Sequence, residues 1–489
     1  MSPYSKSVVP PVVEALLLSN DYPSPADERF IMQEMERSLK EVVAIEQEIQ
    51  SLRSRIQASK AHAEKLKTTL RPVRKLPTEL IHKILLYLKP KGPVDLYDWC
   101  EEPRPWYLGM ICRRWRAVAL DTPQLWSSFK IGVDTYELDI LSETEMMKTY
   151  LERSGNHPLT FVASCSISHP AFDALFQQSS RWKDVELYTN TKTLSKIPTQ
   201  NCQFPLLHRL SIDGDNFGDV TSSINIFKHA PQLTCLHLSA DFFPQVAMPW
   251  SQITEFRQHR SEYMSDENAL DLLSLMPNIQ ELSLWVRGDP PPPREPIVLP
   301  DLRKLTYRGD HTEIFHSLTL PALEEFYLTD WAYGQMPAII ISLFLRSACS
   351  LTKLELGTAY ADDNELIAIL QATPSLVSLT LWRAAGYDLG EELFKALKAP
   401  SKSSKDSPLL PNLHSFKLAT YRKIPFTATL FDMLESRTQP ENAKAAKPVA
   451  RLQSVQLLTD NPREPSASTT RCLETLRRRG LDVNVVLNY

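Results

Sequence analysis

Glycine is scarce in this sequence, with 13 residues among 489, whereas there are 37 prolines. The glycine-rich phosphate loops G-x-x-x-x-G-K-[ST] and G-x-G-x-x-G are both absent. The zinc-protease pattern H-E-x-x-H and the hydrolase pattern G-x-S-x-G are absent too. We therefore expect no cofactor, no metal centre and no catalytic residues. The protein is expected not to be an enzyme, and an enzyme that lacks these motifs is the least favoured alternative.

Three further features are missing: an excess of positive charge, paired cysteines and a long apolar run. The 54 Lys and Arg are outnumbered by 58 Asp and Glu, which argues against a nucleic-acid partner. The seven cysteines are scattered with no C-x-x-C pair, as expected for reduced thiols of the cytoplasm or nucleus. The most apolar segment, residues 338–345, is too short to cross a bilayer, so no membrane association is expected.

Residues 30–71 are expected to form one long helix, after a disordered tail over residues 1–29 that contains five prolines. Residues 31–70 contain neither Gly nor Pro, and a seam of mostly apolar residues recurs in alternating steps of four and three. Such a seam predicts a coiled coil, here about 60 Å long. The helix either pairs with a second copy or another partner, or folds back on its own protein. The seam comprises Ile31, Met35, Ser38, Val42, Ile45, Ile49, Leu52, Ile56, Ser59, Ala63, Leu66 and Leu70.

The most specific segment begins after Pro72 and reads LPTELIHKILLYL over residues 76–88. Pro77 suits the first turn of a helix, and the Leu and Ile residues that follow recur at helical spacing. A second helix is expected over about residues 106–120, which include the motif CRRWRAVA. The segment closes on Leu-Trp at residues 125–126.

Together these pieces resemble an F-box over about residues 74–130, and the Leu-Trp-Ser-Ser ending resembles F-box-like proteins of mushroom-forming fungi. One departure is an insertion with four prolines (residues 90, 93, 103 and 105) between the two helices. The resemblance implies that residues 72–130 form an F-box domain, with Cys112 packed inside. It also implies binding to the Skp-type linker subunit of a cullin–RING ubiquitin ligase and, through it, to the ligase core. The implied linker contacts are Leu76, Pro77, Leu80, Ile84, Leu85 and Leu88.

Residues 131–489 contain a repeated pattern: a breaker followed by apolar residues at offsets +2, +5 and +7, as in Pro205 with Leu207, Leu210 and Ile212. Helical segments such as residues 266–275 and 391–397 fill many gaps between the repeats. This alternation is the signature of leucine-rich repeats, so we expect an α/β fold: an irregular solenoid of short parallel strands alternating with helices. A β-propeller is the structural alternative, which the helical spacers disfavour. The pattern returns after Pro231, Pro277, Pro300, Pro321, Pro374 and Pro411, and without proline at Trp182, Leu351 and Leu452.

A target-binding rim is expected where the strands end, because large aromatic rings and arginines dominate binding hot spots. The expected rim consists of Trp285, Arg287, Arg308, Trp331, Trp382 and Arg383.

The sequence as a whole predicts a substrate-recognition adaptor of an SCF-type ubiquitin ligase. Its F-box would bind the linker subunit, and its repeats would bind a target protein that the sequence does not identify. The alternative is a coiled-coil scaffold or interaction protein whose F-box has diverged from the ligase.

Overall fold

A computed structural model describes residues 9–19, 21–96, 105–132, 140–164, 171–198, 202–214, 223–259, 262–329, 336–357, 362–383, 390–400, 407–420, 426–438, 449–459 and 466–487. The side chains of residues 140–143, 171, 383 and 487 are not described. The chain divides into two compact units, Met1–Lys83 and Ile84–Tyr489, which are taken in turn.

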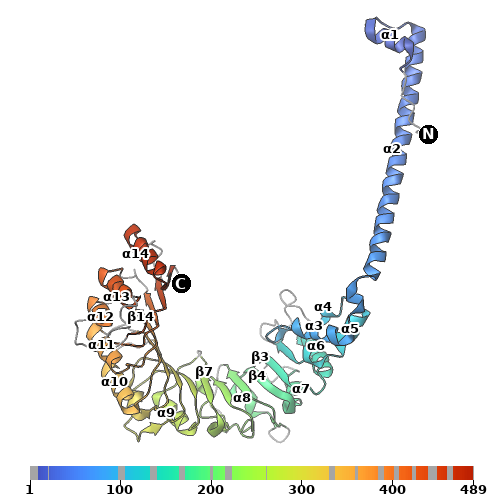
Figure 1. The fold of residues 1–489 in the computed structure, drawn as a ribbon. Helices are drawn as coiled ribbons and strands as arrows, with labels where there is room; N and C mark the ends of the chain where they lie inside the picture. Colours follow the sequence, from blue (N-terminus) through green and yellow to red (C-terminus); the bar gives the residue numbers. More distant parts are fainter. Residues whose placement is uncertain are drawn as a thin grey trace. The chain divides into compact units, whose positions relative to one another are not determined.

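The first unit is dominated by one long helix, α2 (Pro25–Thr69), shown in blue in Figure 1. The Ser24 side chain accepts a hydrogen bond from the Asp27 amide, and Pro25 occupies the first turn, where its missing N–H costs nothing. The predicted long helix is thus confirmed, although it begins five residues earlier than expected. Its pairing as a coiled coil stays a prediction.

The prediction of a disordered tail over residues 1–29 is wrong for part of that range, because α1 (Pro11–Ser19) is helical and residues 25–29 belong to α2. Prolines are compatible with both helices since they lie at or just before the first turns. After α2, a short 3₁₀ turn, Pro72–Lys75, leads into α3 (Thr78–Tyr87).

The second unit contains a parallel sheet of 15 strands whose order follows the chain. A separate two-stranded sheet pairs β9 (Ile297–Val298) with β11 (Leu318–Thr319). The expected α/β class with parallel strands is confirmed. The strands of the large sheet are β1 (Val94–Asp95), β2 (Ser128–Ile131), β3 (Leu159–Ser164), β4 (Trp182–Tyr188), β5 (Arg209–Asp213), β6 (Cys235–Leu238), β7 (Glu255–Gln258), β8 (Glu281–Val286), β10 (Lys304–Gly309), β12 (Glu325–Thr329), β13 (Lys353–Gly357), β14 (Ser378–Arg383), β15 (Ser415–Thr420), β16 (Ser454–Thr459) and β17 (Asp482–Leu487).

Helices connect many of the strands, and α9 to α13 lie together along one face of the sheet (Figure 1). The other face carries the alternate side chains of the strands and is called the open face below. The helices of this unit, beyond the end of α3, are α4 (Pro105–Leu108), α5 (Arg113–Leu120), α6 (Ile140–Arg153), α7 (Ala171–Phe176), α8 (Thr191–Ser195), α9 (Asp266–Leu275), α10 (Met336–Ser347), α11 (Asp363–Gln371), α12 (Glu391–Leu397), α13 (Ala428–Thr438) and α14 (Ala467–Arg478).

The residues at offsets +2, +5 and +7 form the core between the sheet and these helices. None of them is more than 3% exposed in any of the repeats named above. The pattern works because alternate strand residues face the helices, and each new strand extends the same apolar layer.

The F-box-like segment and the repeats share this sheet. β1 lies between the two expected F-box helices and pairs with β2, so the sheet begins inside residues 72–130. The expected domain boundary at residues 130/131 falls within β2. Trp126 donates a hydrogen bond from its indole nitrogen to the Ala119 carbonyl at 2.8 Å, and the Arg153 guanidinium of α6 stacks 4.5 Å from its ring.

The single helix expected over residues 106–120 is two helices, α4 and α5, which corrects that expectation. Gly109 follows the short α4, and Cys112 adopts an extended conformation as the N-cap of α5. The Arg116 side chain donates to the Gly109 carbonyl at 3.1 Å and so fixes the turn. Cys112 is exposed at this turn, so its expected burial is wrong.

Candidate partner-binding surfaces

One face of α3 is buried and the neighbouring face is exposed. Ile81 and Leu85, one turn apart, are completely buried. Leu80 is 43% exposed, Tyr87 is 90% exposed and Leu88 is 41% exposed. Because positions four and seven apart share a helix face, Leu80, Ile84, Tyr87 and Leu88 form an apolar strip, called the α3 ridge.

The structure separates the six expected linker contacts into exposed and buried groups. Leu80 and Leu88 belong to the α3 ridge, Pro77 is exposed, and Leu76 and Ile84 are half-buried. The prediction that Leu85 contacts the linker subunit is wrong, because its side chain has no exposed surface and packs in the core. Tyr87 was missed by sequence reasoning, although its spacing of seven from Leu80 places it on the same face.

The open face of the sheet is built from rows of side chains that the strand register aligns. In β8, Glu281, Ser283 and Trp285 are half-buried, whereas the residues between them are buried. Their neighbours in β10 are Lys304, Thr306 and Arg308. The same alternation continues through β12 and β13, and the register extends the three rows to Ser378, Thr380 and Trp382 of β14, of which Thr380 is buried.

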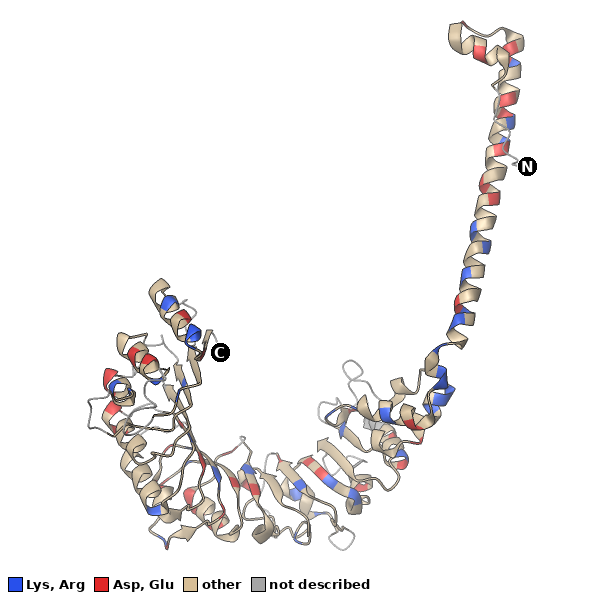
Figure 2. Cartoon of the chain, in the orientation of Figure 1, with Lys and Arg blue, Asp and Glu red and all other residues tan. Residues whose placement is uncertain are grey.

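The first row consists largely of alternating charges. Glu281 lies 3.8 Å from Lys304, and Lys353 lies 3.8 Å from Glu325, whereas Arg257 of the next row lies 3.7 Å from Glu281. Figure 2 shows both signs of charge on the strands around β7. Such exposed pairs contribute little stability, and a row of mixed sign does not provide the continuous positive path that a nucleic acid requires.

The other rows bring aromatic rings and cations together. The Arg308 guanidinium lies 4.3 Å from the centre of the Trp285 ring, and the Lys417 ammonium lies 4.9 Å from that of Trp382. The Tyr327 hydroxyl donates to Glu325 at 2.6 Å. Burial and this hydrogen bond together raise the pKa of Tyr327, so it remains a neutral donor at physiological pH. Rings held in this way are preorganised for contact with a partner.

A hollow of about 660 Å³ lies on the open face over strands β5 to β13. Trp285, Arg308 and Tyr327 line it together with His259 and Glu355. The His259 imidazole lies 2.8 Å from the Ser211 hydroxyl and 3.6 Å from the Asp213 carboxylate. The hollow thus combines aromatic, basic and acidic groups on a broad surface, which suits a protein segment better than a small apolar ligand.

The structure brings together only part of the expected rim. Trp285 and Arg308 line the hollow, and Trp382 donates from its indole nitrogen to Glu355 beside it at 2.7 Å. Arg287 instead pairs with Asp310 at 2.8 Å and stacks on Tyr263 at 4.1 Å. Arg383 ends β14, but its side chain is not described, and Trp331 lies outside the described residues.

Sequence reasoning missed Tyr327 and His259 as members of this surface. Tyr327 lies at offset +6 after Pro321, between two core positions of its repeat. A strand residue that lies between two buried residues must face the opposite side of the sheet. The repeat pattern could therefore have predicted that Tyr327 faces the open side. His259 follows a strand without the full repeat pattern, and no such signal marks it.

Cys235, His237 and Glu255 form the one cluster of metal-ligand types found among the described residues, with ligand atoms within 4.8 Å of one another. The His237 Nε2 atom lies 3.7 Å from both the Cys235 sulfur and a Glu255 oxygen. That Glu255 oxygen is 2.9 Å from the Arg257 guanidinium. Burial raises the pKa of Cys235 to about 12, so the sulfur is held as a neutral thiol. A divalent cation would meet a thiol and an arginine here, so the cluster fits a metal poorly.

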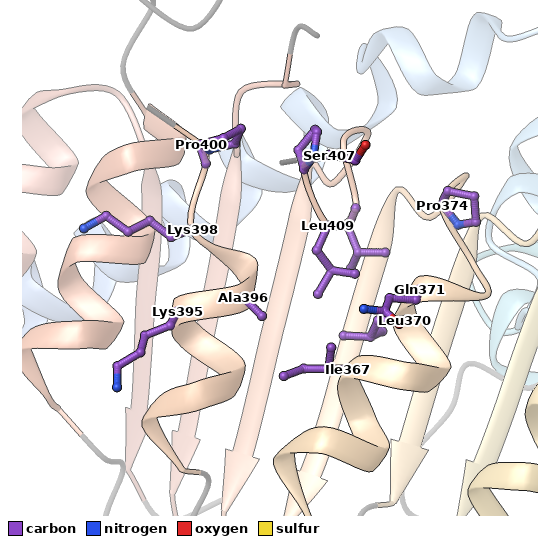
Figure 3. Close-up of a pocket in the computed structure, with 13 residues that line it drawn as sticks. Ile367, Leu370, Gln371, Pro374, Lys395, Ala396, Lys398, Pro400, Ser407 and Leu409 are labelled. Carbon is purple, nitrogen blue, oxygen red and sulfur yellow. The ribbon is translucent and has the colours of Figure 1, made fainter. Parts of the chain in front are cut away.

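A second cavity, of about 820 Å³, opens on the helical side between α11 and α12 (Figure 3). Ile367, Leu370 and Leu409 provide its apolar wall, and the described residues that line it include no Asp, Glu, His or Cys. The described lining of this cavity includes Pro400 and Ser407, which flank residues that are not described. The titratable side chains of its described lining are Lys395 and Lys398, and their ammonium groups pair with Glu392 at 2.8 Å and with Asp432 at 3.2 Å.

No protein-family model matches the chain, and no curated protein has a matching sequence. Within the described part of the chain, none of the helices has both the length and the apolar character that crossing a membrane demands.

Proposed function

We propose that this chain is a non-enzymatic substrate receptor of an SCF-type ubiquitin ligase. Its F-box-like segment binds the Skp-type linker subunit, and the repeats, which we propose form a leucine-rich-repeat solenoid, bind a target protein. The receptor acts by proximity, because holding the target beside the ligase raises its effective concentration at the ubiquitin-charged enzyme.

The α3 ridge is the observation that carries this proposal. A helix that stabilised only its own protein would expose polar residues on its outer face, as α14 exposes Arg478 and Glu474. On α3, Leu80, Tyr87 and Leu88 are exposed instead, within the segment whose motif resembles an F-box. Exposed apolar side chains on one helix face are the usual form of a helix-in-groove contact.

The open face supports the second half of the proposal. Its aromatic and cationic side chains extend across many strands of the sheet. Hot spots of protein interfaces are enriched in Trp, Tyr and Arg, which are the residues gathered here. Free thiols at Cys112, Cys202, Cys235, Cys349 and Cys472 fit a reducing compartment, so we place the receptor in the cytoplasm or nucleus.

Co-elution of the full chain with a purified Skp-type linker subunit tests the proposal. The wild-type chain is expected to co-elute, and the variant Leu80→Asp with Ile84→Asp is expected to elute alone. Lys83→Asp introduces the same acidic residue on this helix, beside the α3 ridge, and is expected to retain the complex. Equal binding by all three proteins would refute the assignment.

The seam of α2 favours a second candidate function, a coiled-coil scaffold with a diverged F-box. No residue of α2 is buried, so its apolar seam is available for pairing. A chain that self-associates but fails to bind the linker subunit would support the scaffold and exclude the receptor.

A further inference from the structure

The apolar seam of α2 lies open along its length. Its larger members, from Met35 to Leu66, are between 39% and 54% exposed, and no residue of the 45-residue helix is buried. A helix with so little internal burial gains its stability from a partner. The charges that flank the seam indicate which partner and in which direction.

The alternating steps of four and three residues along the seam define which of its residues occupy the a and d positions of the heptad. Met35, Val42, Ile49, Ile56, Ala63 and Leu70 occupy the a positions, and Ile31, Ser38, Ile45, Leu52, Ser59 and Leu66 the d positions. The Asp, Glu, Lys and Arg residues at the flanking e and g positions are all acidic before residue 49 and all basic after it: they are Glu34, Glu41, Glu46 and Glu48, and then Arg53, Arg55, Lys60 and Lys67. Residues 25–48 contain seven acidic and three basic residues, and residues 49–69 one acidic and five basic.

A parallel pair of α2 helices would place like charges together. In that arrangement each g residue faces the e residue five positions further along the partner. Glu41 would face Glu46, and Arg55 would face Lys60. Only Glu48 with Arg53 would attract, so a parallel pair is disfavoured.

We propose that α2 pairs with α2 of a second copy in the antiparallel direction, with Ile49 opposite Leu52. In this register g residues face g and e residues face e, so Glu48 meets Arg55 and Glu46 meets Arg53, each twice by symmetry. The register also places Ile31 opposite Leu70, so the seam is covered from end to end.

The two polar interruptions of the seam fit the same register. Ser38 lies opposite the small Ala63 of the second copy, and Ser59 lies opposite Val42. Neither serine therefore faces another serine, and each layer of the seam retains at least one apolar side chain. A polar residue within a seam sets register at some cost in stability.

The helix macrodipole does not account for this distribution of charge. It favours acidic residues in the first turn and basic residues in the last turn, and its effect fades beyond them. Glu46, Glu48, Arg53 and Arg55 lie in the middle of α2, several turns from either end. Pairing between antiparallel copies gives these central charges a role, and it does not depend on the proposed ligase function.

The antiparallel pair has a geometric consequence. Leu70 of the second copy would lie opposite Ile31 of the first. The two copies of Leu70 would therefore lie about 60 Å apart, since 39 residues separate Ile31 from Leu70. The two F-box-like segments would then leave the pair at opposite ends.

Charge variants of the full chain, compared by sedimentation equilibrium, test the proposal. The wild type is expected to have twice the 55.7 kDa mass of one chain. Glu46→Lys and Arg55→Glu each convert two attractive contacts into repulsive ones and should weaken the dimer about tenfold. In a parallel pair both changes would strengthen association. Gln47→Lys, on the outer face of the heptad, is the control, and adding Arg53→Glu to Glu46→Lys should restore the dimer.

A distance measurement tests the direction independently. A spin label at Gln33→Cys, in a chain whose seven native cysteines are replaced by Ser, should report a separation of about 50 Å between copies. A parallel pair would give a separation below about 30 Å. A monomeric wild type, or the shorter separation, would overturn the proposal.

Discussion

Asp266 shows how a single residue can make the stability of the repeats depend on pH. It lies in the first turn of α9 with no exposed side-chain surface, and neither carboxylate oxygen accepts a hydrogen bond among the described residues. Burial raises its pKa to about 6, and the nearby Glu313 adds to this, although His311 at 3.4 Å opposes it. The folded chain therefore holds the Asp266 proton more tightly than the unfolded chain does.

Asp266→Asn should remove this pH dependence. Because the pKa of Asp266 is raised on folding, the wild type gains stability as pH falls from about 6 to about 4, and it carries the full cost of the buried charge above 6. The stability of the variant relative to wild type should therefore increase by up to about 3 kcal/mol from pH 4 to pH 7. Urea unfolding at several pH values measures this difference. A difference that stays constant with pH would contradict the prediction.

Arg437 is a buried cation that serves as a structural donor. Its guanidinium donates to the carbonyls of Leu397, Leu409 and Leu410 at 2.6, 2.6 and 3.0 Å. Burial lowers the pKa of Arg437 to about 10, so it remains charged at neutral pH. It thereby connects α13 to the end of α12 and to the turn before β15.

Arg437→Met should destabilise the protein by about 3 kcal/mol or more, because three carbonyls lose their donor in the interior. Arg478→Met removes a guanidinium whose side chain is 81% exposed and should change stability by less than about 0.5 kcal/mol. The midpoint of chemical unfolding compares the two variants. Equal midpoints would show that the three carbonyls find other partners.

Asp363 links two consecutive helices of the repeats. Its carboxylate accepts hydrogen bonds from the Gly390 and Leu393 amides, both at 3.0 Å, at the start of α12. The α12 N-cap, Gly390, has no side chain to perform this role. A Cβ atom at residue 390 would lie 2.4 Å from an Asp363 oxygen, so the close approach requires glycine.

Asp363→Ala should cost about 1–2 kcal/mol and increase amide hydrogen exchange at Leu393. Gly390→Ala should be destabilising in the wild type but tolerated better beside Asp363→Ala, since the clash is then gone. A double-mutant cycle measures this coupling, which is expected to exceed about 0.5 kcal/mol. Additive effects of the two changes would contradict the contact.

The elements of the repeats could be predicted because their pattern is local and strict. Offsets +2, +5 and +7 identified the buried face of the strands, and residues 266–275 and 391–397 proved to be helices with the expected bounds. The division at Gly109 of the helix expected over residues 106–120 could not be predicted, because it depends on contacts such as the Arg116 hydrogen bond. The burial of Leu85 beside the exposed Leu80 depends equally on what packs against each face of α3.

The open face of the sheet is the element we expect to bind the target. Trp285→Ser with Tyr327→Ser should abolish target capture but leave binding to the linker subunit unchanged, because neither residue contributes to the α3 ridge. Quantitative mass spectrometry of proteins captured by the wild type, this variant and the Leu80→Asp, Ile84→Asp variant separates the two activities. A captured set that is unaffected by the open-face variant would exclude this face as the target site.

At the scale of the whole molecule, one chain carries two kinds of exposed surface suited to proteins. The α3 ridge is small and apolar, as a helix that enters a groove requires, whereas the open face is broad and mixed in character. A receptor needs both surfaces, since the first fixes it to the ligase and the second selects what is presented.

Titration calorimetry of the full chain with the Skp-type linker subunit tests this function most directly. The wild type should bind with a negative heat-capacity change, the mark of buried apolar surface. Leu80→Asp with Tyr87→Asp, at two exposed positions, should weaken binding at least a hundredfold, or by about 3 kcal/mol, while Lys83→Asp remains near wild type. Absence of binding by the folded wild type, or equal affinity for all three proteins, would contradict the proposed receptor.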